Sequence, residues 1–142
     1  MTLLELSAAR HMIAAAETCA REIGVKATIA VLDHGGNLIA AARMDDAWPG
    51  GFDLAVGKAQ TARAFQAPSA TFVPMIQPGE PLFAVNNVAG GKYVILGGGL
   101  PVRSGESIIR AVGISGGRIE QDVAIAEAAV AAFKDRTDRK IS

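Results

Sequence analysis

Three charged residues occupy positions where the surrounding sequence is mostly apolar. Arg43 and Asp45 close an apolar run, and Lys58 lies within an otherwise apolar helical stretch. If the guanidinium and ammonium groups converge, they form a pocket suited to a carboxylate. The alternatives are an Arg43–Asp45 ion pair that holds a loop, and a Lys58 side chain that extends outward to water. The sequence leaves these interpretations open.

Two turn-forming segments could also contact a ligand. Asp33 begins an Asp-His-Gly-Gly-Asn turn, where its carboxylate is expected mainly to accept hydrogen bonds from turn amides. A glycine triplet, 97–99, could present backbone N–H groups to an anion, but it lacks a phosphate-loop pattern, which favours a tight bend. The candidate ligand-binding residues are therefore Asp33, Arg43, Asp45, Lys58, Gly97, Gly98 and Gly99. No catalytic residue can be named.

His11 and Cys19 are the residues that bear on metal chemistry. They share one face of a predicted helix but lie about 12 Å apart along its axis, so they cannot ligate one small ion. Two histidines and one cysteine without a dense cluster predict no metal site. A haem iron needs only one or two axial ligands, so haem is a candidate cofactor with His11 as its candidate ligand.

The first predicted helix must position His11. A capping box at Thr2–Glu5 starts it, and Gly24 ends it after Ile23. One face is expected to face the core, namely Leu3, Leu6, Ile13, Ala16, Ala20 and Ile23. A second stripe is formed by Leu4, Ala8, His11, Ala15 and Cys19. Because a small domain has few inner layers, this stripe predicts a subunit interface.

The remaining periodicity predicts a hairpin, two more helices and further strands. The expected strands are residues 28–32, 38–44, 92–96, 100–102 and 108–115, and the expected helices are 52–65 and 119–133. Prolines permit at most a short helix, at 71–76, within 67–87, and residues 134–142 are expected to fray. This order predicts one α+β domain, residues 1–142, with helices on a mostly antiparallel sheet.

Composition limits the classes of function. Half of the 142 residues are apolar, and the 14 basic and 14 acidic residues cancel. This balance argues against nucleic-acid binding, and the few aromatic residues argue against a base-stacking surface. A single cysteine, no signal peptide and no apolar run of about 20 residues favour the cytoplasm and no membrane association.

Six short segments in order resemble the GlcG/HbpS family, which includes the C-terminal domain of PduO-type proteins. They are residues 29–38, 43–45, 58–62, 97–102, 112–116 and 121–122. The resemblance implies a profilin-like domain in which helices flank a five-stranded antiparallel sheet. It also implies dimers that build larger rings or octamers, and binding of haem or corrinoid-pathway ligands or an accessory role in small-acid catabolism.

Three hypotheses of function follow. The first is a homo-oligomeric small-ligand-binding protein for haem, another tetrapyrrole or a small organic acid. The second is a catabolic isomerase, lyase or hydrolase acting on a small carboxylic acid, and the third is a structural or assembly partner. We expect the loop after Arg43 and the Gly97–Gly99 bend to line one pocket, with Lys58 at its wall.

Overall fold

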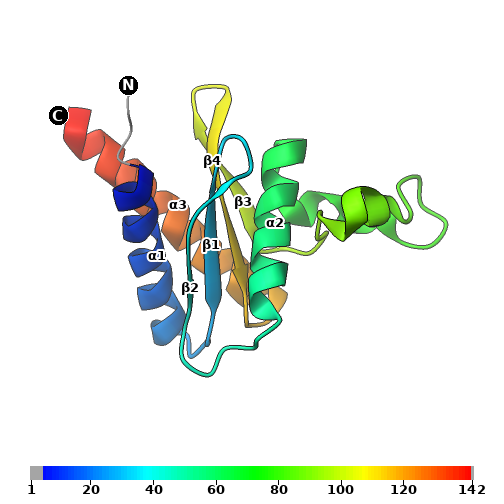
Figure 1. Ribbon diagram of the computed structural model, residues 1–142, viewed down its shortest axis with the longest axis horizontal. Coiled ribbons are helices and arrows are strands. Elements are labelled where there is room, and N and C mark those ends of the chain that lie inside the picture. Colours follow the sequence, from blue (N-terminus) through cyan, green and yellow to red (C-terminus); the bar gives the residue numbers. More distant parts are fainter. Residues whose placement is uncertain (1–4, 142) are drawn as a thin grey trace.

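The computed structural model describes the backbone of residues 5–141 and the side chains of residues 5–135. The elements are α1 (Glu5–Glu22), β1 (Thr28–Asp33), β2 (Leu38–Arg43), α2 (Gly51–Phe65), η1 (Ser69–Ile76), η2 (Val85–Gly91), β3 (Gly99–Ser104), β4 (Ser107–Ser115) and α3 (Ile119–Ile141) (Figure 1). No helix in this described part is long and apolar enough to cross a bilayer.

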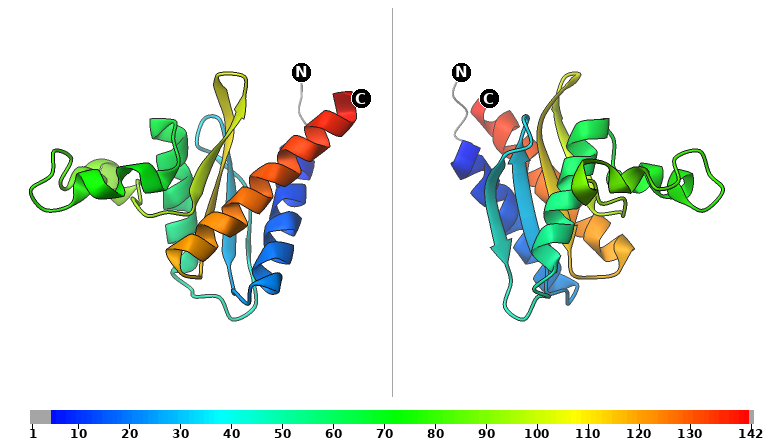
Figure 2. Two further views of the ribbon diagram at one scale, coloured as in Figure 1. Left: turned by 180° about the vertical axis from the view of Figure 1, so that it is seen from behind. Right: turned by 45° about the vertical axis from the view of Figure 1, so that its right-hand side comes forward.

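The sheet has the order β2-β1-β4-β3, and every neighbouring pair is antiparallel. Helices α1 and α3 cover one face and α2 covers the other (Figure 2). Side chains alternate between these layers, as expected for strands. Val31 and Ile114 pack under α1 and α3, whereas Leu32 and Ala111 pack under α2. The predicted α+β class is confirmed.

The expected five-stranded sheet is wrong, because the structure has four strands. Residues 92–96 are apolar enough for a strand, but their backbone groups bond outside the sheet. The Val94 N–H donates to Gly57 O, 3.2 Å away, and Thr61 Oγ1 donates to Val94 O at 2.9 Å. Ser69 Oγ donates to Leu96 O. These partners belong to α2 and η1, so the segment is bound without joining a ladder.

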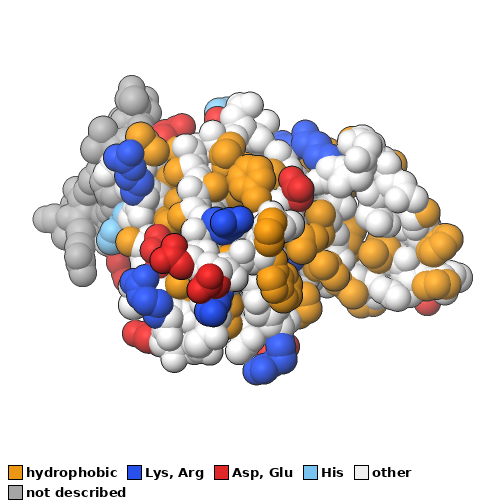
Figure 3. Space-filling view, turned by 60° about the horizontal axis from the view of Figure 1, so that its bottom comes forward, with side chains coloured by type: hydrophobic (Ala, Val, Ile, Leu, Met, Phe, Trp, Pro, Cys, Tyr) orange, Lys and Arg blue, Asp and Glu red, His pale blue; other side chains and the backbone are white. Residues whose placement is uncertain are grey.

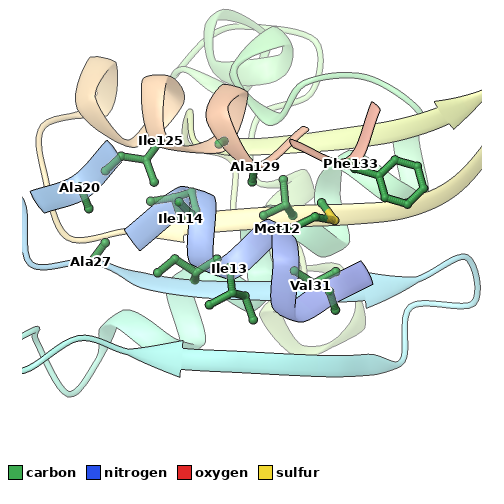
Figure 4. Packing of buried hydrophobic residues seen from close by; sticks show 14 of the residues in the cluster. Met12, Ile13, Ala20, Ala27, Val31, Ile114, Ile125, Ala129 and Phe133 are labelled. Atoms are coloured by element: carbon green, nitrogen blue, oxygen red, sulfur yellow. The ribbon is translucent and has the colours of Figure 1, made fainter. Parts of the chain in front are cut away.

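Helix α1 is buried on two sides within a single chain. Met12 and Ile13 point toward the sheet, and Ile125 and Ala129 of α3 pack beside them (Figure 4). Ala8, predicted for the subunit interface, is only 8% exposed. Cys19 of the second stripe also lies against Ala124 of α3, so α3 covers part of this stripe, whereas His11 is exposed and Leu4 lies outside the described residues. The predicted subunit interface on this stripe stays a prediction. Within the core-face prediction, Ala16 and Ala20 are buried, but Leu6 and Ile23 are exposed.

The helix ends agree only partly with the sequence. Gly24 has the left-handed φ of 76° expected at a helix stop. Thr2, the start of the predicted capping box, lies outside the described residues. Helix α3 begins at Ile119 as predicted but continues to Ile141, so residues 134–141 extend the helix instead of forming a separate tail.

Helix α2 lies very close to the sheet because small residues line the contact. Ala55, Ala59 and Ala62 are fully buried. A Cβ atom on Gly113 of β4 would collide with the backbone oxygen of Ala55. Glycine is therefore required at this point by the close approach of two backbones.

The chain between α2 and β3 forms an arm that projects from the three-layer body (Figures 1 and 2). We define the arm as residues 69–91. It contains two short 3-10 helices, and Pro74 lies inside the first of them. The predicted irregular, proline-broken segment is thus confirmed.

Candidate functional site

Asp33 closes the β1–β2 hairpin. Its Oδ1 accepts hydrogen bonds from the backbone N–H groups of Gly35 and Asn37, both at 2.9 Å. The Asn37 amide donates to both carboxylate oxygens, at 3.3 and 3.2 Å. Desolvation opposes ionisation, but these hydrogen bonds together outweigh it and lower the pKa of Asp33. Both oxygens of the Asp33 carboxylate therefore accept hydrogen bonds within the turn.

Lys58 does not extend to water. Its Nζ donates to Ile114 O at 2.8 Å and to Asp122 Oδ2 at 3.0 Å, and the two charged side chains are 2% and 3% exposed. Asp122 Oδ1 also accepts the Gly117 N–H at 2.9 Å. Burial raises the pKa of the Asp122 carboxyl, while the Gly117 N–H and Lys58 oppose the increase. This pair joins α2, β4 and the start of α3.

The glycine triplet forms the tight bend that the sequence favours. Gly98 O accepts the Ile114 N–H at 2.9 Å, and the Gly99 N–H donates to Ser69 Oγ at 2.8 Å. A Cβ on Gly98 would lie 3.1 Å from Lys58 Nζ. Gly97 is also buried, and its Cβ would approach Ile119. Lys58 and Gly98 are thus adjacent, as predicted. However, the Lys58 ammonium and the Gly98 carbonyl oxygen both already bond to the backbone of Ile114.

Arg43 and Asp45 lie elsewhere. Both are exposed at the end of the edge strand β2, and among the described residues no ion pair joins them. Arg43 pairs across the strands with Thr28, which in turn pairs with Ser115. Strands β1 and β4 therefore separate Arg43 from the buried ammonium of Lys58, and a single chain does not form the predicted two-cation pocket.

His11 and Cys19 have different environments on α1. His11 is exposed. Cys19 is half-buried, with its Sγ 3.9 Å from Ala124 O, and burial, followed by the nearby Glu22 carboxylate, raises the pKa of its thiol. No group of three His, Cys, Asp or Glu side chains within the described chain could hold a metal ion.

At least two hollows indent the surface of the described part of the chain. One, of about 50 Å³, is lined only by Phe65, Phe72, Leu82, Val85 and Ile95 at the base of the arm. The other, of about 430 Å³, is lined by Glu5, Leu6, Ser7 and Arg10 on the first turns of α1. The second is wide and open to solvent rather than enclosed. Among the described residues, none of the predicted ligand-binding positions lines either hollow.

Arg110 is a residue that the sequence interpretation missed. It lies on β4 and is completely buried, yet none of its three guanidinium nitrogens makes a hydrogen bond within the described chain. Its Nη1 lies 3.4 Å from Glu5 Oε1, and its guanidinium carbon lies 5.2 Å from the centroid of the Phe133 ring. The sequence feature that could have identified it is an arginine at a core-facing position of the apolar run 108–114.

The fold is a small α+β domain in which helices cover both faces of an antiparallel sheet. The family model for haem degrading protein HbpS-like matches residues 4–131. The chain belongs to this HbpS-like family, which confirms the resemblance found in the sequence.

Individual relatives agree with this assignment. The chain is 39% identical to an uncharacterised 15.0 kDa protein of the dhaT-dhaS intergenic region in Citrobacter freundii, over 93% of both chains. The structure of the Klebsiella pneumoniae protein ORFY is 38% identical, with a TM-score of 0.89 over 91% of this chain and 89% of that one. The structure of a PduOC–haem complex is 31% identical, with a TM-score of 0.85 over 92% and 94%.

Proposed function

We propose that this chain binds haem or a related tetrapyrrole. The observation that carries the proposal is the likeness to the PduOC–haem complex, which extends over nearly the whole of both chains. The family's description as haem degrading supports the same ligand class. Haem supplies iron-centred redox chemistry when it is bound, and the protein supplies an axial ligand and a surface for the macrocycle.

His11 is the residue of this chain best suited to ligate the iron. It is exposed on α1, and no hydrogen bond or ion pair in the described chain occupies its imidazole. Ala14 and Ala15 lie three and four residues further along the same helix. Their small side chains leave room for a flat ring to approach the imidazole. The other histidine, His34, lies in the polar hairpin turn.

Haem titration tests this proposal. The parent protein is expected to give a saturable Soret shift at stoichiometric haem, and His11→Ala is expected to lose it. His34→Ala is the matched control, because it removes an equally exposed imidazole from a different surface, and it should titrate like the parent. Weak, unsaturable absorbance in the parent would contradict haem binding and move the catabolic enzyme acting on a small carboxylic acid to first place.

The working form of the protein is a homo-oligomer, a dimer or a larger ring up to an octamer. The arm supports this part of the proposal, because Met75, Leu82, Phe83 and Val88 on it are each at least 38% exposed. Figure 3 shows hydrophobic side chains along this projection. Exposed apolar surface is typical of an interface, so the arm is an expected contact in addition to the α1 stripe.

A further inference from the structure

The two buried cations of this chain differ in how their charge is satisfied. Lys58 has both a carboxylate and a carbonyl oxygen within 3.0 Å. Arg110 has five N–H donors in a planar fork, yet its nitrogens form no hydrogen bond with any residue that the structure describes. A buried charge without hydrogen-bond partners is strongly unfavourable. The orphaned donors therefore indicate that an acceptor is missing at this position.

Among the side chains that the structure describes, the carboxylates around Arg110 do not supply that acceptor. Asp33 is its direct partner across the strands, but both Asp33 oxygens already accept bonds within the hairpin. Glu5 approaches to 3.4 Å, without hydrogen-bond geometry, and its side chain is 44% exposed. On another side, the Phe133 ring packs against the guanidinium. Glu5 is thus a loosely held counter-ion. The Arg110 guanidinium can bind a carboxylate with hydrogen-bond geometry more tightly than it binds Glu5.

The hollow of about 430 Å³ and the ion pair of Arg110 have Glu5 in common. Glu5 contacts both features, since it lines the hollow and is the ion-pair partner of Arg110. Arg10, one and a half turns along α1, contributes a second guanidinium to the lining. Planar guanidinium groups pair with carboxylates through two parallel hydrogen bonds. A movement of the Glu5 side chain would connect the hollow to Arg110.

We propose that the Glu5–Arg10 hollow is a binding site for a small organic carboxylate, which displaces the Glu5 side chain and pairs with Arg110. Arg10 binds a second carboxylate of the same ligand, so a dicarboxylate is preferred over a monocarboxylate. The site does not require His11, and only its propionate alternative rests on the proposed haem binding. The carboxylate belongs either to a free acid or to the propionate of a tetrapyrrole.

Calorimetric titration with succinate, compared with acetate and with chloride at equal ionic strength, tests the site. The parent should bind succinate saturably and acetate more weakly. Arg110→Met should lower the affinity for succinate by about tenfold or more. Its melting temperature should stay equal or rise, because the variant removes a buried guanidinium that makes no hydrogen bond in the described chain and whose partner Glu5 is partly exposed. Arg110→Lys keeps the charge but loses the paired geometry, and it should also bind weakly.

Two further variants sharpen the test. Glu5→Gln removes the competing carboxylate and should raise the affinity for succinate. Arg21→Met, an exposed arginine at the other end of α1, is the matched control and should bind like the parent. The proposal is overturned if the parent shows no saturable succinate binding, or if Arg110→Met binds succinate as tightly as the parent does.

Haem titration of the same variants distinguishes the two sources of the carboxylate, a free acid and a tetrapyrrole propionate. If Arg110→Met loses succinate binding but keeps the Soret shift, the ligand is a free acid. If both fall together, and haem dimethyl ester binds the parent as weakly as haem binds Arg110→Met, the ligand group is a propionate. Failure of the haem proposal is seen separately, as a parent protein that binds succinate but shows no saturable Soret change.

Discussion

Single residues in this chain show how burial decides the role of a charge. Lys58 was expected either to reach water or to meet Arg43 in a ligand pocket, and instead it pairs with Asp122 inside the protein. The sequence could not identify this partner, because the two residues are 64 positions apart and meet only when α2 and α3 pack around the end of β4. Asp33 was predictable, because its turn partners are adjacent in the sequence.

The Lys58–Asp122 pair gives the first prediction. Lys58→Met should lower the free energy of unfolding by about 3 to 5 kcal/mol, because it leaves the buried Asp122 carboxylate without a counter-ion. The double variant Lys58→Met with Asp122→Leu should recover part of this loss. Urea unfolding at neutral pH measures both. A single variant within about 1 kcal/mol of the parent would show that solvent reaches the pair.

Asp33 gives a prediction about pH. Its folded-state pKa is lowered from the ordinary 3.8, so its stabilising contribution is present above that value and is lost as pH falls through the lower folded pKa. Asp33→Ala should cost about 1 to 2 kcal/mol at neutral pH and flatten the acid limb of the stability curve. Asp33→Asn, which retains an acceptor without the charge, should lose less. An unchanged acid limb in Asp33→Ala would contradict this assignment.

Elements were predictable wherever periodicity and turn residues agreed. The hairpin, α2, β4 and the start of α3 were expected within about one residue of their observed bounds. The other predictions were limited by one cause. A hydrophobic pattern in the sequence does not specify which element a segment will pack against or bond to. Residues 92–96 have strand composition but bond to α2 and to Ser69. The two apolar faces of α1 indicated two buried sides, and α3 covers part of the second one within the same chain, while the subunit interface predicted there stays a prediction.

The contact between α2 and the sheet gives a prediction at this scale. Gly113→Ala should destabilise the protein by about 3 kcal/mol or more, because the added methyl group overlaps the Ala55 backbone oxygen and forces two elements apart. Gly50→Ala is the matched control, since Gly50 has helical dihedrals and open space around its Cβ position. It should shift stability by less than about 0.5 kcal/mol. Equal melting temperatures for the two variants would refute the close approach.

At the scale of the whole molecule, the body and the arm differ in how far their apolar side chains are buried. The body buries its apolar side chains between three layers. The arm contacts the body mainly at its base, where Phe65 meets Phe72 and Tyr93 at ring-centroid distances of 5.6 and 5.1 Å. Beyond that base its apolar side chains face outward. The sequence predicted an irregular segment here, but its projection from the body depends on how its ends are held.

The arm gives the last prediction, which concerns assembly. The parent protein at micromolar concentration should sediment as an oligomer. Phe83→Ser should shift it toward the 14.6 kDa monomer, because Phe83 is a large apolar side chain, 60% exposed, on the proposed contact surface. Trp48→Ser is the matched control, because Trp48 is equally exposed, at 60%, but lies in the β2–α2 loop. It should leave the sedimentation profile unchanged. A monomeric parent would defeat the proposal of a homo-oligomer, and dissociation by Trp48→Ser alone would place the interface on the loop instead of the arm.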